Sequence, residues 1–153
     1  IAFVLNEDLR GPGIRKEDVI SVTEKIFPCF EIVDSRINNW QIKIQDTIAD
    51  NASCGVFLLG DGFNYQNDYE LDKLEVKVSK NGEHLSSGYG SAVQGHPAEA
   101  VAWLANTLGK YNIPLLKGEI ILSGSLVPLE PAIAGDHFYM ELIGIGDCEV
   151  YFS

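Results

Sequence analysis

The sequence has no long apolar run, no excess of positive charge and no segment that resembles a targeting signal. Its apolar runs, such as Val56–Leu59 and Ile120–Leu122, are far too short to cross a bilayer. The 11 lysines and arginines are outnumbered by 22 acidic residues, and the net charge of −11 argues against nucleic acid or an anionic membrane as a partner. We therefore expect a cytoplasmic protein that acts on something small.

Cysteine and histidine are scarce and show no metal-binding spacing. The three cysteines, Cys29, Cys54 and Cys148, form no CxxC motif, and the three histidines lack H-x-H or H-x₃-H spacing. Each cysteine lies in or beside an apolar segment, so the sequence predicts buried free thiols in a reducing compartment. Cys54, beside Ser53, is an alternative nucleophile, although no histidine lies near it in sequence.

The chain does have the composition of an ordinary globular protein. Its 153 residues, of which 46% are hydrophobic, suffice for a single domain, residues 1–153, with a proper core. The chain opens without Met, directly on the apolar run Ile1–Leu5. A domain rarely opens on a bare apolar strand, so we expect that the front of a longer polypeptide is missing.

Strand patterns outnumber helix patterns. Apolar periodicity predicts helices at Lys16–Phe27 and from Pro97 to either Gly109 or Asn112, while Asp46–Ser53 is either a short helix or a structured loop. Asn81-Gly82 between two alternating segments predicts a β-hairpin. The predicted strands are Ile1–Leu5, Cys29–Val33, Val56–Leu59, Leu71–Lys80, Glu83–Tyr89, Glu119–Leu122, His137–Ile143 and Glu149–Phe152. Because their order is no regular βαβ alternation, we expect an α+β fold with a mixed, mainly β core and two to three helices.

The first candidate site residue is Glu31, which stands between Phe30 and Ile32 in an apolar strand pattern. An ionised carboxylate in a segment meant for the interior is costly unless something pairs with it. A hard divalent cation is one such partner, since it prefers oxygen ligands. The hypothesis is a metal ligand; the alternative is a surface carboxylate that faces water or an arginine such as Arg36.

A polar cluster follows at Asp46–Ser53. Its small residues, with Gly55 just beyond, suit backbone N–H groups that point at a carboxylate or enolate oxygen. The same residues also form ordinary turns. Lys43, between two isoleucines, is placed either to stabilise developing negative charge or simply to extend into solvent.

The loop Gly124-Ser125-Leu126 follows a predicted strand. Small-residue loops at strand ends often contact substrates, and they are also common turns. The order Ser123-Gly124-Ser125 does not fit the G-x-S-x-G pattern of a nucleophilic serine.

Several long segments resemble one family over essentially the whole chain: FEIVDSRI, WQIKIQDTIADNAS, GHPAEAVAWLANTLG and KGEIILSGSLVPLEP. They are similar to the 2-hydroxypenta-2,4-dienoate (2-keto-4-pentenoate) hydratases and 4-oxalocrotonate decarboxylases, within the fumarylacetoacetase C-terminal-domain superfamily. The resemblance implies a fumarylacetoacetase C-terminal-like β-roll. It also implies Mg²⁺ or Mn²⁺ held by three carboxylates, of which one matches Glu31. The other two, a Glu-x-Glu pair, would stand just before Ile1, so the chain resembles the C-terminal part of the catalytic domain and is expected to be inactive by itself.

The resemblance further implies a metal-dependent hydratase. It would add water to a 2-hydroxy-2,4-dienoate and give a 4-hydroxy-2-oxo acid in aromatic meta-cleavage catabolism. In this family pattern Asn51, Ser53, Ser125 and Leu126 bind the substrate, Lys43 adds positive charge, and the enzyme assembles as a homo-oligomer. The alternatives are a 4-oxalocrotonate decarboxylase, an acylpyruvate-type C–C hydrolase and a non-catalytic partner subunit.

Overall fold

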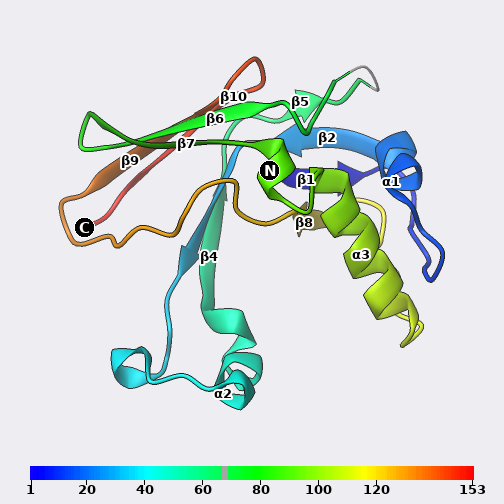
Figure 1. Cartoon of the computed structure of the whole chain (residues 1–153), viewed down its shortest axis with the longest axis horizontal. Coiled ribbons are helices and arrows are strands. Elements are labelled where there is room, and N and C mark those ends of the chain that lie inside the picture. The colour runs from blue at the N-terminus through cyan, green and yellow to red at the C-terminus, as the bar shows by residue number, and fades with distance from the viewer. Residues whose placement is uncertain (67–68) are drawn as a thin grey trace.

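The computed structural model describes residues 1–66 and 69–153, and the described strands form three sheets with antiparallel pairing (Figure 1). The first sheet has the order β5 (Phe63–Asn64), β2 (Thr23–Phe27), β1 (Ala2–Leu5) and β8 (Ile120–Leu122). Strand β1 lies between β2 and β8, and its Phe3 and Leu5 are fully buried. The apolar opening of the chain therefore forms the centre of the core.

The second sheet contains the predicted hairpin. Its order is β10 (Gly146–Tyr151), β9 (His137–Leu142), β6 (Glu75–Lys80) and β7 (Glu83–Tyr89). Strands β6 and β7 are joined at Asn81-Gly82, where both residues have positive φ, 54° and 83°. This geometry confirms the Asn-Gly turn. Val76 and Val78 are buried while Lys77 between them is exposed, as the alternation of a strand requires.

The third sheet is a ribbon of β3 (Cys29–Val33) and β4 (Cys54–Leu59). Residues 34–53 connect these two strands and project from the rest of the molecule (Figure 1); we call them the arm. The arm contains η1 (Asn38–Trp40), α2 (Ile44–Ala49) and η2 (Asn51–Ser53). Neither η1 nor α2 has a buried residue. The arm therefore gains little from packing, and hydrogen bonds at its base must hold it.

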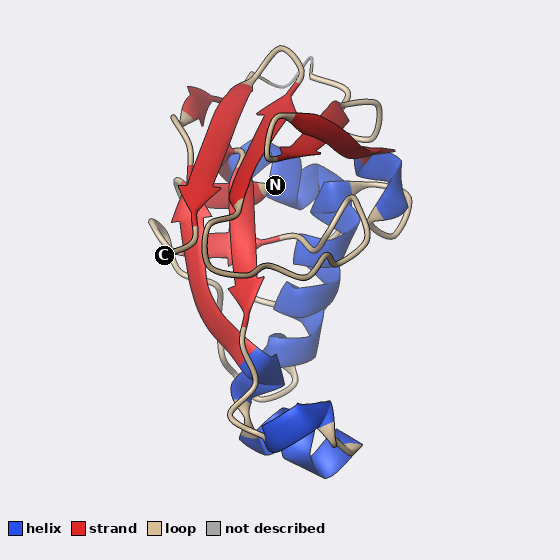
Figure 2. Ribbon diagram, turned by 90° about the vertical axis from the view of Figure 1, so that its left-hand side faces the viewer, coloured by secondary structure: helices blue, strands red, loops and turns tan. Residues whose placement is uncertain are grey.

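The two longer helices, α1 (Lys16–Val22) and α3 (Pro97–Gly109), pack against each other and lie to one side of the second sheet (Figure 2). Helix α3 begins as predicted, with Pro97 in its first turn and Nδ1 of His96 accepting a hydrogen bond from the Ala98 N–H group at 3.1 Å. A short helix, η3 (Gly90–Ala92), precedes it. Among the described residues, no helix is long and apolar enough to cross a membrane.

The α+β class and the mainly β core are confirmed, but the predicted helix Lys16–Phe27 is wrong beyond Val22. Thr23–Phe27 is strand β2, which pairs with β1 through Phe3 and Ile26. Its apolar residues fit a helix face and a buried strand equally well, and the neighbouring strand decides between the two.

Two smaller differences concern the middle of the chain. Strand β6 begins at Glu75, not at Leu71. Between the predicted strands Val56–Leu59 and Leu71–Lys80 the structure has a further short strand, β5, and residues 67 and 68 lie outside the described residues.

Candidate functional site

A pocket of about 770 Å³ opens beside ribbon β3–β4 and the second sheet. Most of its wall is apolar, with Phe30, Leu85, Phe138 and Met140 among the lining residues. Its charged lining residues are all acidic: Glu31, Asp34 and Glu130. No lysine, arginine or histidine of the described chain lines it. A concave, mostly apolar site with few polar groups is the usual form of a small-molecule site.

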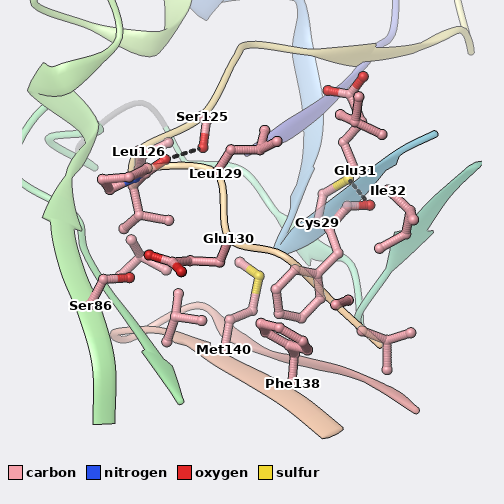
Figure 3. A pocket seen from close by; sticks show the side chains of 18 of the residues that line it. Cys29, Glu31, Ile32, Ser86, Ser125, Leu126, Leu129, Glu130, Phe138 and Met140 are labelled. Carbon is pink, nitrogen blue, oxygen red and sulfur yellow. Dashed lines mark hydrogen bonds between the residues drawn. The ribbon is translucent and has the colours of Figure 1, made fainter. Parts of the chain in front are cut away.

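Glu31 lies in β3 opposite Phe57 of β4, and its side chain is exposed. The sequence-based expectation that this strand lies in the interior is wrong. No residue of β3 is fully buried, and Val56 and Phe57 on the partner strand are 60% and 44% exposed. Within the described residues the Glu31 carboxylate has neither a hydrogen bond nor an ion pair. It is therefore an unpaired carboxylate in the pocket wall (Figure 3).

Arg36, the alternative partner of Glu31, binds elsewhere. Its guanidinium group lies 3.4 Å from Oδ1 of Asp50 and donates to the carbonyl oxygen of Cys54 at 2.6 Å. Both contacts are at the base of the arm. Arg36 is therefore not the partner of Glu31, which leaves a metal ligand or a water-facing carboxylate as the two readings of Glu31.

Asp50 closes the base of the arm. Its side chain is only 5% exposed, and Oδ2 accepts hydrogen bonds from the hydroxyls of Ser35 at 3.0 Å and Ser53 at 2.8 Å, and from the backbone N–H of Arg36 at 3.3 Å. Burial alone would raise the pKa of Asp50. The hydrogen bonds from Ser53, Ser35 and Arg36 outweigh burial and hold the pKa below its ordinary value. One buried carboxylate thus joins the two ends of the arm.

The turn after Asp50 has an unusual backbone. Asn51, Ala52 and Ser53 all have left-handed φ angles, at 53°, 55° and 56°. Each non-glycine residue in this region costs roughly 1–2 kcal/mol, so the surrounding contacts must hold the turn. Two hydrogen bonds supply those contacts. The Ser53 hydroxyl donates to the Asp50 carboxylate, and the Asp34 N–H donates to the Ser53 carbonyl at 2.8 Å.

The pocket brings together three of the six sequence-predicted site residues. Ser125 and Leu126 line it together with Glu31. The Ser125 hydroxyl donates to the Val127 carbonyl at 2.6 Å, which fixes the loop. The carbonyl of Leu126 lies so close to Gly88 of β7 that a Cβ there would overlap it.

The other three residues, Lys43, Asn51 and Ser53, are on the arm and do not line the pocket. Lys43 precedes α2 and is exposed, as is Asn51, whereas Ser53 is only 3% exposed. The structure therefore divides the predicted set between the pocket and the arm.

The pocket also contains residues that the sequence did not single out as site residues, namely Asp34, Trp40, Ser86 and Glu130. Trp40 comes from the arm and Ser86 from β7, so neither adjoins a predicted site residue in sequence. Of these four residues, only Glu130 could have been suspected from the sequence, because it belongs to the same loop as Ser125 and to the segment LSGSLVPLEP.

The cysteines are free, as predicted, but only Cys148 is buried; Cys29 and Cys54 are half-buried. Cys29 lines the pocket, and burial raises the pKa of its thiol to about 11. A raised pKa favours the protonated thiol, which is the less nucleophilic form.

The described residues contain no group of three or more His, Cys, Asp or Glu side chains that could hold one metal ion. Glu31 and Ser125 both line the pocket, and Glu31 offers one free carboxylate there. This part of the chain fits one ligand of a metal site and not the complete set.

Comparison with known proteins gives one family. The model of the fumarylacetoacetate (FAA) hydrolase C-terminal family matches residues 1–152. The chain is 60% identical over its full length to a 2-hydroxyhexa-2,4-dienoate hydratase of Comamonas testosteroni, and it covers 58% of that protein. It is 55% identical over 113 residues to a 2-hydroxypent-2,4-dienoate hydratase of Pseudomonas putida, of which this match covers 51%.

A solved structure has the same fold. The 4-oxalocrotonate decarboxylase of Pseudomonas putida G7, complexed with magnesium and adipate, superposes with a TM-score of 0.94 at 33% identity. The match covers 99% of this chain and 58% of that one. The chain thus spans between half and three fifths of the length of the relatives it matches.

Proposed function

The chain belongs to the fumarylacetoacetate (FAA) hydrolase C-terminal family, and on this basis we propose that it is part of a metal-dependent hydratase. The enzyme adds water to a 2-hydroxy-2,4-dienoate and gives a 4-hydroxy-2-oxo acid during the catabolism of aromatic compounds. The observation that carries the proposal is the 60% identity, over the full chain, to a protein named 2-hydroxyhexa-2,4-dienoate hydratase. The activity is assigned to the longer protein, because the chain covers 58% of that relative.

We propose that residues 1–153 form the C-terminal part of the catalytic domain. Ile1 is 6% exposed and lines the pocket, so a segment joined to it would begin at the pocket wall.

A divalent cation, Mg²⁺ or Mn²⁺, is proposed as the cofactor. The related decarboxylase structures are complexed with magnesium in one case and calcium in the other. Glu31 would supply one carboxylate, and the further ligands would come from outside this chain. When bound, the cation would act as a Lewis acid that stabilises the enolate charge of a 2-oxo acid.

The residues of this chain would orient the substrate and exclude water. The Ser125 hydroxyl and the loop through Leu126 line the same pocket as Glu31 and would position the substrate carboxylate. The apolar wall would enclose the carbon chain and strengthen every polar contact within it. For Asn51, Ser53 and Lys43, substrate contact stays a prediction that requires the arm to approach the bound acid.

The test is turnover by the full-length protein. With Mg²⁺ it should bleach the ultraviolet absorbance of 2-hydroxypenta-2,4-dienoate, and EDTA should stop the reaction. Glu31→Gln should lower kcat/KM by at least about a hundredfold, because the free carboxylate is lost, whereas Glu83→Gln in the exposed hairpin should leave it unchanged.

The same assay separates the alternatives. Release of carbon dioxide from 4-oxalocrotonate without hydration would assign the protein to the decarboxylases, which the structural match at 33% identity favours as the second candidate. Release of pyruvate from acylpyruvates would indicate a C–C hydrolase. No turnover of any of these acids would leave a non-catalytic subunit. A homo-oligomer and a cytoplasmic location remain predictions, to be checked by sedimentation and by cell fractionation.

A further inference from the structure

We propose that Glu130 is a specificity-determining residue, through which the pocket selects 2-hydroxydienoates with a neutral tail against those with a second carboxylate. The inference deepens the proposed function and rests on it, since it assumes that the substrate carboxylate is held at Glu31. It concerns the other end of the same substrate.

Glu130 and Glu31 lie at different ends of the pocket. Figure 3 shows Glu31 at one side, on β3, and Glu130 at the other, on the loop between β8 and β9, with its carboxylate turned toward Ser86. A dienoate whose carboxylate binds at the Glu31 end of the pocket therefore extends its tail toward Glu130.

The loop that carries Glu130 is anchored. Nζ of Lys80 donates to the carbonyl of Pro131 at 2.9 Å and forms an ion pair with Asp136 at 2.8 Å. On the other side, the Ser125 hydroxyl holds the carbonyl of Val127. These contacts hold the backbone of the loop on both sides of Glu130, which lines the pocket.

The charge of Glu130 is uncompensated. Within the described residues its carboxylate has no ion pair and no hydrogen bond, and the other charged residues of the pocket, Glu31 and Asp34, are also acidic. A second carboxylate on the substrate would meet this like charge, and the two carboxylates would repel each other. Such repulsion against the wrong ligand is a common source of specificity.

A neutral tail meets a more favourable surface. Leu126 and Met140 supply apolar contacts near Glu130. The Ser86 hydroxyl is buried and has no hydrogen-bond partner among the described residues, and Ser86 lines this end of the pocket, so a neutral polar group is tolerated better here than a second carboxylate. This end of the pocket therefore suits an alkenyl or hydroxyalkyl tail.

A binding experiment tests the inference without catalysis. Calorimetry on the full-length, Mg²⁺-loaded protein should measure the affinities for hexanoate and adipate, which have equal carbon number and differ by one carboxylate. The wild type should prefer hexanoate. Glu130→Gln should tighten adipate binding at least about tenfold and change hexanoate binding less than about twofold.

Two variants serve as controls. Glu130→Asp keeps the charge and should keep the wild-type preference. Glu83→Gln makes the same change of charge on the exposed hairpin strand β7, outside the pocket, and should have no effect. Because Glu130 is exposed and makes no bond that folding needs, these substitutions should leave the melting temperature unchanged.

The inference is overturned if the wild type binds adipate more tightly than hexanoate, if it binds neither acid, or if Glu130→Gln leaves the ratio of affinities unchanged. Turnover separates this failure from failure of the proposed function. If the protein hydrates 2-hydroxypenta-2,4-dienoate but Glu130→Gln does not change the ratio of the two affinities, it is a hydratase whose selectivity does not depend on Glu130. If Glu130→Gln changes the ratio of affinities but the protein does not hydrate the dienoate, the inference about Glu130 holds and the proposed reaction is wrong.

Discussion

Single side chains show where sequence reasoning succeeds and where it fails. Glu31 was singled out because a carboxylate stood between two apolar residues, and its place in the pocket wall agrees with a site residue. The reason for that choice was wrong, since the strand is not interior and the carboxylate faces water. Apolar neighbours indicate a strand, but they do not reveal whether another element covers it.

The structural role of Asp50 could not be predicted from the sequence, because its neighbours in sequence give no sign of it. In the sequence it is one of several small polar residues, and each of them suits a turn. Its importance comes from Ser35 and Arg36, which are distant in sequence and donate to its buried carboxylate. Such a network depends on the fold, so a local pattern cannot predict it.

Two equally buried hydroxyls give a matched test of hydrogen bonding. Thr23 and Ser123 are each 6% exposed; the Thr23 hydroxyl donates to the Val19 carbonyl at 2.8 Å, whereas the Ser123 hydroxyl has no partner among the described residues. Thr23→Val should lower the free energy of unfolding by about 1 kcal/mol, because it removes a satisfied bond. Ser123→Ala should leave it unchanged or raise it by up to about 1 kcal/mol.

Urea unfolding of both variants measures the difference. A loss of stability in Ser123→Ala as large as that in Thr23→Val would mean that the Ser123 hydroxyl has a partner in solution.

Among the elements, strands with turn signals were predicted most accurately. The predictions of the β6–β7 turn and of the start of helix α3 were correct because each has a local turn or capping signal, Asn81-Gly82 in one case and His96-Pro97 in the other. The helix over Lys16–Phe27 failed at Val22, where nothing in the sequence marks an end. The pairing of β2 with β1 and β5 sets that boundary, and pairing between distant segments is absent from a local pattern.

Strand β7 and the Ser125 loop are coupled through Gly88. Because a Cβ at Gly88 would overlap the Leu126 carbonyl, Gly88→Ala should push the loop away from β7. We expect the free energy of unfolding to fall by about 1–3 kcal/mol and, in the full-length enzyme, KM to rise more than kcat falls.

Gly82→Ala is the comparison, since nothing lies near its Cβ position and its cost should come from the backbone alone, at φ 83°. It should destabilise the hairpin without raising KM. An equal effect of both variants on KM would mean that the Leu126 contact is unimportant for the site.

At the scale of the whole molecule, stability should depend on acidic pH in a definite direction. The pKa of Asp136 is lowered to about 2 by hydrogen bonds from Lys80, Asn81 and the backbone of Ile133, and hydrogen bonds also lower the pKa of Asp8 and Asp18. The folded state therefore binds fewer protons than the unfolded state below pH of about 4. The stability from these carboxylates is present above that pH and is lost as the pH falls toward 2.

Urea midpoints measured between pH 5 and pH 2.5 should fall steadily. Asp136→Asn should start lower at pH 5 and show a flatter dependence, because its contribution no longer titrates. A slope identical to that of the wild type would exclude Asp136 from the acid response.

Because Asp50 joins the two ends of the arm, the length of the arm can differ between related proteins. Since hydrogen bonds to one carboxylate hold Ser35 against Ser53, the spacing of the two strand ends does not depend on the helix between them. Insertions and deletions beyond Lys43, between Ile44 and Ala49, a stretch without a buried side chain, should therefore be tolerated during evolution. Divergence in length is expected to accumulate there while the ribbon on either side keeps its register.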